Sequence, residues 1–177
     1  MNMFNQEILF SPKECEFILE STDNDYKKSE TELSRKSNKQ SEYRTSSESL
    51  NEINESLKIL LLNKLSKFDV IDLPTHGHII RYNQGEYFKI HSDRGAESSD
   101  RFKTLIIQLS DDNDYSGGDL IVYDESKKPT MCNKKIGNTI MFDSQMLHEV
   151  TPIIKGTRYV FIAWLRSNDF NFKKGLL

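Results

Sequence analysis

The chain has 177 residues, 36% of them hydrophobic, and its 10 Phe, 7 Tyr and 1 Trp are enough for one folded core. Its 24 basic and 27 acidic residues are mixed along the chain and give a net charge of -3 and a pI of about 5.8. These values indicate a single globular domain and give no support for a nucleic-acid partner, because no continuous basic stripe is present.

Two helices are expected in the first 73 residues. Ser11-Pro12-Lys13-Glu14 has the pattern of a capping box with proline at the first helical position, so a helix should begin there and end where a polar stretch, residues 22–48, begins. That stretch predicts a mobile or loosely packed insertion, or a lid. From Ser47 or Ser49 the apolar residues recur at three-and-four spacing and predict an amphipathic helix that ends near Phe68.

After Pro74 the chain has the pattern of short strands separated by turns. The six expected strands are Ile79–Tyr82, Tyr87–Ile90, Phe102–Leu109, Leu120–Tyr123, Thr139–Phe142 and Tyr159–Leu165. Helices followed by many short strands predict a mostly β, α+β fold, a sheet sandwich or barrel with the helices on one side. The expected organisation is one domain over residues 1–177, with helical support in 1–73, a β core in 74–167 and a tail in 168–177.

The two cysteines and the N-terminal residues bear on the cellular compartment. Cys15 and Cys132 lie far apart without metal-binding spacing, and two cysteines do not make a disulfide scaffold in a domain of this size. Residues 1–10 mix polar and apolar side chains, and no window contains 18 uninterrupted apolar residues. We therefore expect a cytoplasmic protein without a signal peptide or a membrane span.

Three residues of the β half can form one metal site. His91-Ser92-Asp93 lies at the end of an expected strand, and its one-residue spacing places both side chains on the same side of an extended chain. His148 follows far downstream, and two neutral imidazoles with one carboxylate form the facial triad that holds non-haem iron. The short motif alone is weak evidence because chance often produces it, and zinc could use the same three ligands.

Arg158 stands ten residues after His148, at the start of a strongly apolar run. An arginine there would suffer a large desolvation cost unless it met an anion, and its planar guanidinium suits a carboxylate such as the distal one of 2-oxoglutarate. The simpler alternative is a strand-end arginine that reaches water or pairs with an acidic residue. Trp164 lies on the same face of a regular strand, where it could line the pocket or be the core tryptophan of the domain.

Several motifs carry a family resemblance. They are Arg81 to Asp93, Phe102 to Asp111 with Gly117-Gly118, His148 to Pro152, and Gly156-Thr157-Arg158. In order and spacing they resemble the prolyl 4-hydroxylase branch of the 2-oxoglutarate- and Fe(II)-dependent dioxygenases, over roughly residues 75–167. Ser11 to Cys15 and Arg44-Thr45-Ser46 resemble N-terminal segments of that family more weakly.

This resemblance implies a double-stranded β-helix, that is a distorted, cupin-like jelly roll, for the β core. It assigns Fe(II) to three ligands, His91, Asp93 and His148. It assigns the co-substrate 2-oxoglutarate to four further side chains, Arg158, Tyr82, Thr104 and Trp164. Tyr82 and Thr104 could equally be ordinary strand residues. The resemblance also implies O2 as a co-substrate and allows ascorbate as an additional reductant.

Two further positions compare with the family. Phe88 stands three residues before His91, where many relatives have tyrosine, so a hydroxyl that they use is missing here. Arg101 matches a residue that meets peptide substrate in some relatives, or it is a loop cation that balances Asp100.

The sequence therefore favours a dioxygenase that hydroxylates an unactivated C–H bond, by resemblance that of a prolyl residue in a peptide or protein. The nearest alternatives are another side chain, a free amino acid or a small molecule as substrate. A non-catalytic jelly-roll binding module is an alternative of a different class, and nucleobase demethylation is disfavoured by the absence of a basic stripe. No membrane partner is expected, and the oligomeric state stays open.

Overall fold

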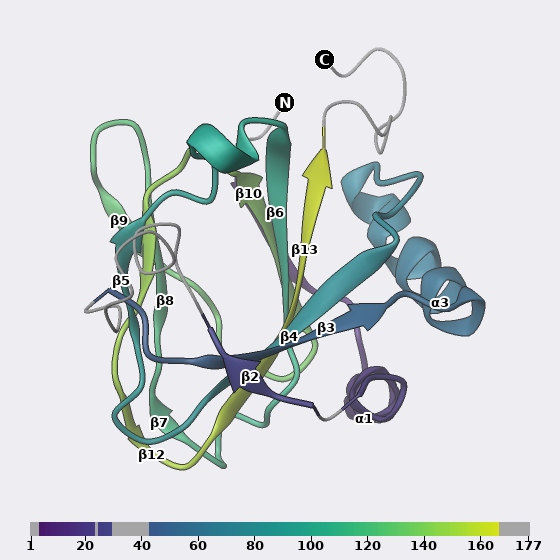
Figure 1. Cartoon of the computed structure of the whole chain (residues 1–177), viewed down its shortest axis with the longest axis horizontal. Coiled ribbons are helices and arrows are strands. Elements are labelled where there is room, and N and C mark those ends of the chain that lie inside the picture. Colours follow the sequence, from purple (N-terminus) through teal and green to yellow (C-terminus); the bar gives the residue numbers. More distant parts are fainter. Residues whose placement is uncertain (1–3, 24, 30–42, 167–177) are drawn as a thin grey trace.

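The computed structural model describes residues 4–23, 25–29 and 43–166, and its central element is a seven-stranded antiparallel sheet (Figure 1). The order of this larger sheet is β1 (Phe4–Ile8), β10 (Asn138–Asp143), β6 (Arg101–Gln108), β13 (Arg158–Arg166), β4 (His76–Tyr82), β3 (Ser47–Glu52) and β2 (Lys27–Lys28). A smaller sheet has the order β5 (Phe88–His91), β11 (His148–Val150), β8 (Leu120–Tyr123) and β9 (Pro129–Met131). A third pairing joins β12 (Ile153–Lys155) and β7 (Ser116–Gly117).

The smaller sheet faces one side of the larger sheet, and the helices α1 (Pro12–Glu20) and α3 (Glu55–Leu65) cover the other side (Figure 1). This arrangement confirms the mostly β fold with helices on one side. No helix within the described ranges is both long enough and apolar enough to cross a membrane.

Both helices begin at side-chain caps. The backbone N–H of Ser11 donates to Glu14 Oε2 at 2.7 Å and the Ser11 hydroxyl accepts from the Glu14 N–H at 3.3 Å, which confirms the predicted capping box. In α3, Asn54 Oδ1 accepts from the Leu57 N–H at 3.0 Å, and a 3₁₀ turn over Ser66–Phe68 ends the helix near the predicted residue.

The predicted start of the second helix at Ser47 or Ser49 is wrong. Residues Ser47–Glu52 form β3, which pairs with β4, and α3 begins only at Glu55. The side chain of Leu50 is 61% exposed, so it was not the first member of a buried helical stripe. Alternate β3 residues Ser49 and Asn51 are buried instead, because the Asn51 amide donates to Ser49 Oγ and the backbone N–H of Asp23 donates to Asn51 Oδ1.

All six predicted strands are present, with bounds that differ by a few residues at most. Seven strands were not predicted, β1, β2, β3, β7, β9, β11 and β12. Most of these are two to five residues long and lack a run of β-branched or aromatic side chains, so their pairing depends on neighbouring strands rather than on local propensity. Of the predicted polar insertion, residues 24 and 30–42 lie outside the described part, as does the predicted tail 168–177.

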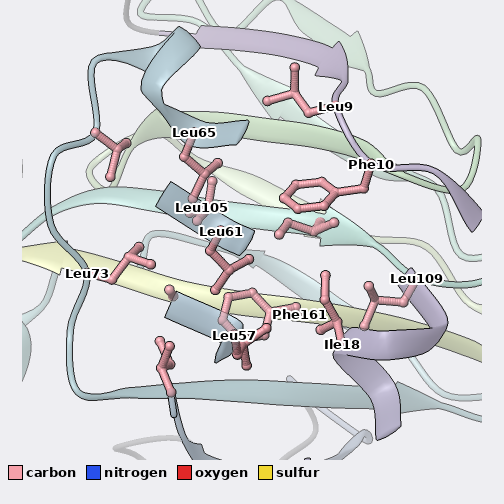
Figure 2. Packing of buried hydrophobic residues seen from close by; sticks show 14 of the residues in the cluster. Leu9, Phe10, Ile18, Leu57, Leu61, Leu65, Leu73, Leu105, Leu109 and Phe161 are labelled. Carbon is pink, nitrogen blue, oxygen red and sulfur yellow. The ribbon is translucent and has the colours of Figure 1, made fainter. Parts of the chain in front are cut away.

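The larger sheet has an apolar core on each face. On β6 and β13 alternate residues point to opposite sides, so Leu105, Ile107 and Phe161 pack against the helices while Ile106 and Val160 face the smaller sheet. Figure 2 shows the helix-side core, in which Leu57, Leu61 and Leu65 of α3 meet Leu105 and Phe161. Burial on both faces explains why these two strands are nearly continuous apolar runs.

Leu61→Ala is expected to lower the free energy of unfolding by about 2 to 5 kcal/mol, because Leu61 is fully buried and its truncation leaves a cavity between α3 and the sheet. Urea denaturation measures the change. Ile59→Ala on the same helix is the control, because Ile59 is 54% exposed and its loss should change stability by much less. Equal effects of the two substitutions would contradict the described packing of α3.

Candidate metal centre and adjoining anion pocket

The pairing of β5 with β11 brings the two predicted imidazole ligands together. β5 ends at His91, β11 begins at His148, and the two residues are direct partners in the antiparallel register. Asp93 follows closely, and its backbone N–H donates to the Ser144 carbonyl at 3.0 Å. One ligand atom of each of the three residues lies within 4.8 Å of the other two. Residues distant in sequence therefore form one compact group of potential metal ligands.

Backbone carbonyls orient both imidazoles. His91 Nδ1 lies 2.7 Å from the carbonyl oxygen of Lys89, and His148 Nδ1 lies 3.0 Å from that of Met146. A carbonyl oxygen only accepts, so each Nδ1 carries the proton and each Nε2 keeps a free lone pair. The Nε2 atoms of His91 and His148 lie 3.6 Å from Oδ1 and 3.5 Å from Oδ2 of Asp93. All three ligand atoms are thus available to one cation.

The protonation states of the group suit a divalent metal. Burial by itself would raise the pKa of Asp93, but the adjacent His148 and His91 and a hydrogen bond from Thr104 together lower that pKa below its ordinary value. Burial lowers the pKa of His148 to about 4, so its imidazole is neutral at pH 7. A charged carboxylate and a neutral imidazole are the forms that bind metal ions.

Thr104 holds the carboxylate of Asp93 in place. Its hydroxyl donates to Asp93 Oδ2 at 2.7 Å and lies 3.0 Å from Ser144 Oγ. Thr104 is fully buried on β6, so this contact ties the larger sheet to a ligand of the smaller one. The described partners of the hydroxyl are these two side chains, and the contact with 2-oxoglutarate that the resemblance implies stays a prediction.

Phe88 covers His91. The two rings are nearly parallel, with an interplanar angle of 14° and centroids 3.4 Å apart. The guanidinium carbon of Arg44 lies 4.9 Å from the centroid of the Phe88 ring, and an isolated backbone bridge joins the same two residues. An apolar ring therefore shields one face of the imidazole.

Arg158 is buried at the start of β13, with only 1% of its surface exposed, so the alternative of an arginine that reaches water is wrong. Its Nε donates to Gln108 Oε1 at 3.2 Å, and its guanidinium carbon lies 5.4 Å from the ring centroid of Tyr82, its direct partner on β4. Burial raises the pKa of Tyr82, so its hydroxyl stays protonated and can donate.

Three buried polar atoms around this guanidinium have no hydrogen-bond partner among the described residues: Arg158 Nη1, Gln108 Nε2 and Tyr115 Oη. Tyr115 lies beside Arg158, since both approach Gly118. An unmatched buried donor costs about 1 to 3 kcal/mol, and the side chains described next to the guanidinium, Gln108 and Tyr115, are both uncharged. Unsatisfied donors around a buried positive charge match the needs of a bound carboxylate, so this pocket and the triad together fit 2-oxoglutarate and a metal ion.

Gly118 makes room for Arg158. Its φ is +63°, and a Cβ atom there would lie 2.3 Å from Ile153 Cδ1 and 3.2 Å from Arg158 Cδ. Gly117 also has a positive φ, so both residues adopt a backbone conformation that favours glycine. Gly118 in addition leaves space for the side chains of Ile153 and Arg158.

Trp164 lies on the same face of β13 as Arg158, but at the other end of the strand. Six residues of extended chain separate the two by roughly 20 Å. Trp164 pairs with Thr104 of β6, and Arg101 and His78 contact its ring. It therefore borders the Asp93 side of the metal group and not the Arg158 pocket, and its predicted contact with 2-oxoglutarate stays a prediction.

Sequence reasoning missed three residues of the site, Gln108, Tyr115 and Ser144. Gln108 is a polar residue in the apolar run of β6, only 1% exposed, and a buried amide of this kind is a signal that could have been used. Tyr115 and Ser144 lie in turns, where only the folded chain shows that they approach Arg158 and Thr104.

Comparison of the sequence with known protein families and curated proteins finds matches to oxygenases and hydroxylases. The model described as the 2OG-Fe(II) oxygenase superfamily matches residues 77–166, half of the chain. A PKHD-type hydroxylase of Idiomarina loihiensis is 34% identical over 90 residues, which cover 50% of this chain and 41% of the relative. One of Shewanella baltica is 32% identical over 94 residues, 49% of this chain and 41% of the relative. The match therefore spans well under half the length of these curated relatives.

Solved structures share the fold. A prolyl-4-hydroxylase of Pseudomonas putida has a TM-score of 0.63 at 14% identity and covers 93% of this chain and 92% of its own. A prolyl hydroxylase of Trichoplax adhaerens, solved with a peptide fragment of the hypoxia inducible factor oxygen degradation domain, has a TM-score of 0.68 at 17% identity, covering 96% and 86%. These similarities confirm the predicted double-stranded β-helix.

Gly118→Ala is expected to destabilise the protein by more than about 2 kcal/mol and to disturb Arg158, because the added methyl group meets Ile153 and Arg158 and the backbone conformation disfavours alanine. Gly85→Ala is the matched control, since Gly85 has a φ of +83° but nothing within 4 Å of the added carbon. Chemical denaturation compares the two. If both variants lost the same stability, the close approach of Gly118 to Arg158 would be refuted.

Proposed function

The chain belongs to the 2OG-Fe(II) oxygenase superfamily, and on that premise we propose that it uses Fe(II), 2-oxoglutarate and O2 to hydroxylate an unactivated C–H bond, that of a prolyl residue in a peptide or protein. The observation that carries this proposal is the compact group of His91, Asp93 and His148 in the same fold as a buried arginine with unsatisfied donors around it. A non-catalytic binding module would need neither.

His91, Asp93 and His148 would hold Fe(II) through two Nε2 atoms and a carboxylate oxygen, on one face of the ion. When bound, the iron and 2-oxoglutarate activate O2, so that one oxygen atom enters the substrate C–H bond and the other enters succinate, with release of carbon dioxide. Because the carbonyls of Lys89 and Met146 accept from the two Nδ1 atoms, both Nε2 lone pairs are available to the metal.

Arg158 would bind the distal carboxylate of 2-oxoglutarate. Its Nη1, Gln108 Nε2 and the Tyr115 hydroxyl would supply the donors, and the centroid of the Tyr82 ring lies 5.4 Å from the guanidinium carbon. Because these groups are buried, the co-substrate loses its water when it binds, and each charge-assisted hydrogen bond is stronger than in water. These residues would thus hold one end of the co-substrate.

The relatives and structural neighbours, which are PKHD-type hydroxylases and prolyl hydroxylases, support the choice of a prolyl residue. The peptide in complex with the Trichoplax adhaerens protein supports a peptide as substrate. Hydroxylation of another side chain, a free amino acid or a small molecule is the alternative outcome of the same assay. Ascorbate as a reductant stays a prediction.

We also propose that residues 1–177 form one dioxygenase domain, supported by β1 and β3, which extend the larger sheet on both sides of the core strands. A cytoplasmic location is proposed as well, and the free, buried thiols of Cys15 and Cys132 support it.

Anaerobic addition of Fe(II) and 2-oxoglutarate should give the weak visible charge-transfer band of the chelated complex, and O2 should then yield succinate. His91→Ala and Asp93→Ala should remove the band and lower succinate formation by more than about 100-fold, because each removes a ligand. His76→Ala, an exposed histidine on β4, is the control and should behave as the wild type. A wild-type protein without the band, or turnover in both ligand variants, would refute the proposal.

Arg158→Gln should raise the 2-oxoglutarate concentration needed for half-maximal succinate formation by about 10- to 100-fold, because a charge-assisted contact worth about 1.5 to 3 kcal/mol is lost. Arg158→Lys keeps the charge and should give a smaller increase, which also guards against misfolding of the glutamine variant. Lys155→Gln, an exposed cation nearby, should change nothing. An unchanged requirement in both Arg158 variants would place the co-substrate carboxylate elsewhere.

A further inference from the structure

Two buried hydroxyl groups form a short chain of hydrogen bonds that ends at Asp93. Thr104 Oγ1 donates to Asp93 Oδ2 at 2.7 Å and lies 3.0 Å from Ser144 Oγ. An ionised carboxylate only accepts, so the single hydroxyl proton of Thr104 is directed to Asp93, and the Ser144 hydroxyl must donate to Thr104. The direction of both hydrogen bonds is therefore determined, from Ser144 through Thr104 to the carboxylate.

Both hydroxyl groups are shielded from water, because Thr104 and Ser144 are fully buried. A buried hydroxyl group needs a hydrogen-bond partner. In the part of the chain that the structure describes, Thr104 is the one partner of the Ser144 hydroxyl. Any effect of this hydroxyl on the Asp93 carboxylate therefore passes through Thr104.

The backbone of Ser144 holds the same ligand. Its carbonyl oxygen accepts from the N–H groups of Asp93 and Arg94, each at 3.0 Å. Ser144 lies between β10 and β11, in the turn that leads to His148. It therefore ties Asp93 to this turn at two points, through its carbonyl oxygen at the Asp93 backbone and through Thr104 at the Asp93 carboxylate.

Thr104 lies far along β6 from the pocket of Arg158. Gln108, the hydrogen-bond partner of Arg158, is the last residue of β6, and four residues of extended chain correspond to roughly 13 Å. The hydroxyl proton of Thr104 is in addition already donated to Asp93. Thr104 is therefore placed to act on the metal ligand, not on a carboxylate that Arg158 binds.

We propose that Ser144 and Thr104 are positioning residues of the metal centre and act as one unit. Ser144 directs the Thr104 proton to Asp93 Oδ2, and this hydrogen bond sets the orientation in which the carboxylate meets the metal ion. A carboxylate that is free to rotate binds an ion less tightly, because its orientation has to be fixed on binding. The Thr104 hydroxyl then serves the metal and not the co-substrate. This inference rests on the proposed function and assigns it two further residues.

The affinity for Co(II) tests this inference without turnover, because Co(II) accepts the same imidazole and carboxylate ligands as Fe(II) and its complexes absorb visible light. Thr104→Val removes the hydroxyl and should weaken Co(II) binding by about 10- to 100-fold, as is typical when a group that orients a metal ligand is lost. Thr104→Ser keeps the hydroxyl and should retain most of the affinity, which guards against a general effect on folding.

Thr139→Val is the matched control. Thr139 is as fully buried as Thr104, but it lies on β10 and its hydroxyl donates to the Gly137 carbonyl. This variant should bind Co(II) as the wild type does. Equal affinity of the wild type and Thr104→Val, or equal losses in Thr104→Val and Thr139→Val, would overturn the inference.

A double-mutant cycle tests whether the two hydroxyl groups act as one unit. Ser144→Ala alone should weaken Co(II) binding by about 2- to 10-fold, which corresponds to one neutral hydrogen bond. In the Thr104→Val background the same substitution should have no further effect, because the Ser144 hydroxyl acts through Thr104. If the effects of the two substitutions multiplied, each residue would act separately and the proposed chain of hydrogen bonds would be wrong.

Titration of 2-oxoglutarate into protein saturated with Co(II) distinguishes the metal from the co-substrate as the target of Thr104. Thr104→Val should bind 2-oxoglutarate about as tightly as the wild type once the metal site is filled. A variant that binds Co(II) normally but 2-oxoglutarate about 10-fold less tightly would show that the hydroxyl contacts the co-substrate, and the inference would be wrong.

The same proteins separate this inference from the proposed function. Co(II) binding that depends on Thr104 and Ser144 as expected, in a protein that hydroxylates no prolyl peptide, would keep the inference and refute the proposed reaction. Prolyl hydroxylation by Thr104→Val at the wild-type rate under limiting Fe(II) would keep the reaction and overturn the inference.

Discussion

The register between β5 and β11 is the constraint on which the site depends. Because His91 and His148 are direct partners in an antiparallel pair, one set of backbone hydrogen bonds determines the separation of both imidazoles. A shift of one residue would turn one imidazole to the other face of the sheet. The carbonyls of Lys89 and Met146 accept from Nδ1 of each ring, so Nε2 is the nitrogen that can bind a metal. The backbone thus largely determines the geometry of the proposed metal centre, and contacts with Ser144 and Thr104 position Asp93.

The two long core strands connect this centre with the rest of the pocket. β6 and β13 are buried on both faces, so their apolar residues stabilise the fold while three polar ones, Thr104, Gln108 and Arg158, lie on the face of the proposed site. These side chains all point to the face opposite the helices. The helices therefore pack on one face of the larger sheet and stabilise the fold, while the side chains of the proposed site lie on the other face.

Much of this could be predicted from the sequence because the signals were local and chemically unusual. A histidine and an aspartate at alternate strand positions, a distant histidine and an arginine in an apolar run each have a physical reason to stand where they do. Strand β3 could not be predicted, because its buried residues are Ser49 and Asn51, whose burial depends on partners elsewhere in the chain. Periodicity correctly placed Trp164 on the same face of β13 as Arg158. It could not show that the length of the strand separates Trp164 from the Arg158 side chain.

Arg44, Phe88 and His91 form a column that joins the segment before β3 to one of the proposed metal ligands. The guanidinium rests near the phenyl ring, and the phenyl ring is stacked flat on the imidazole. Residues more than forty positions apart in the sequence thus meet at one proposed ligand, and the backbone pairing of Phe88 with Val150 fixes the ring in place. Because the phenyl ring has no hydroxyl, it covers the imidazole without a hydrogen bond of its own.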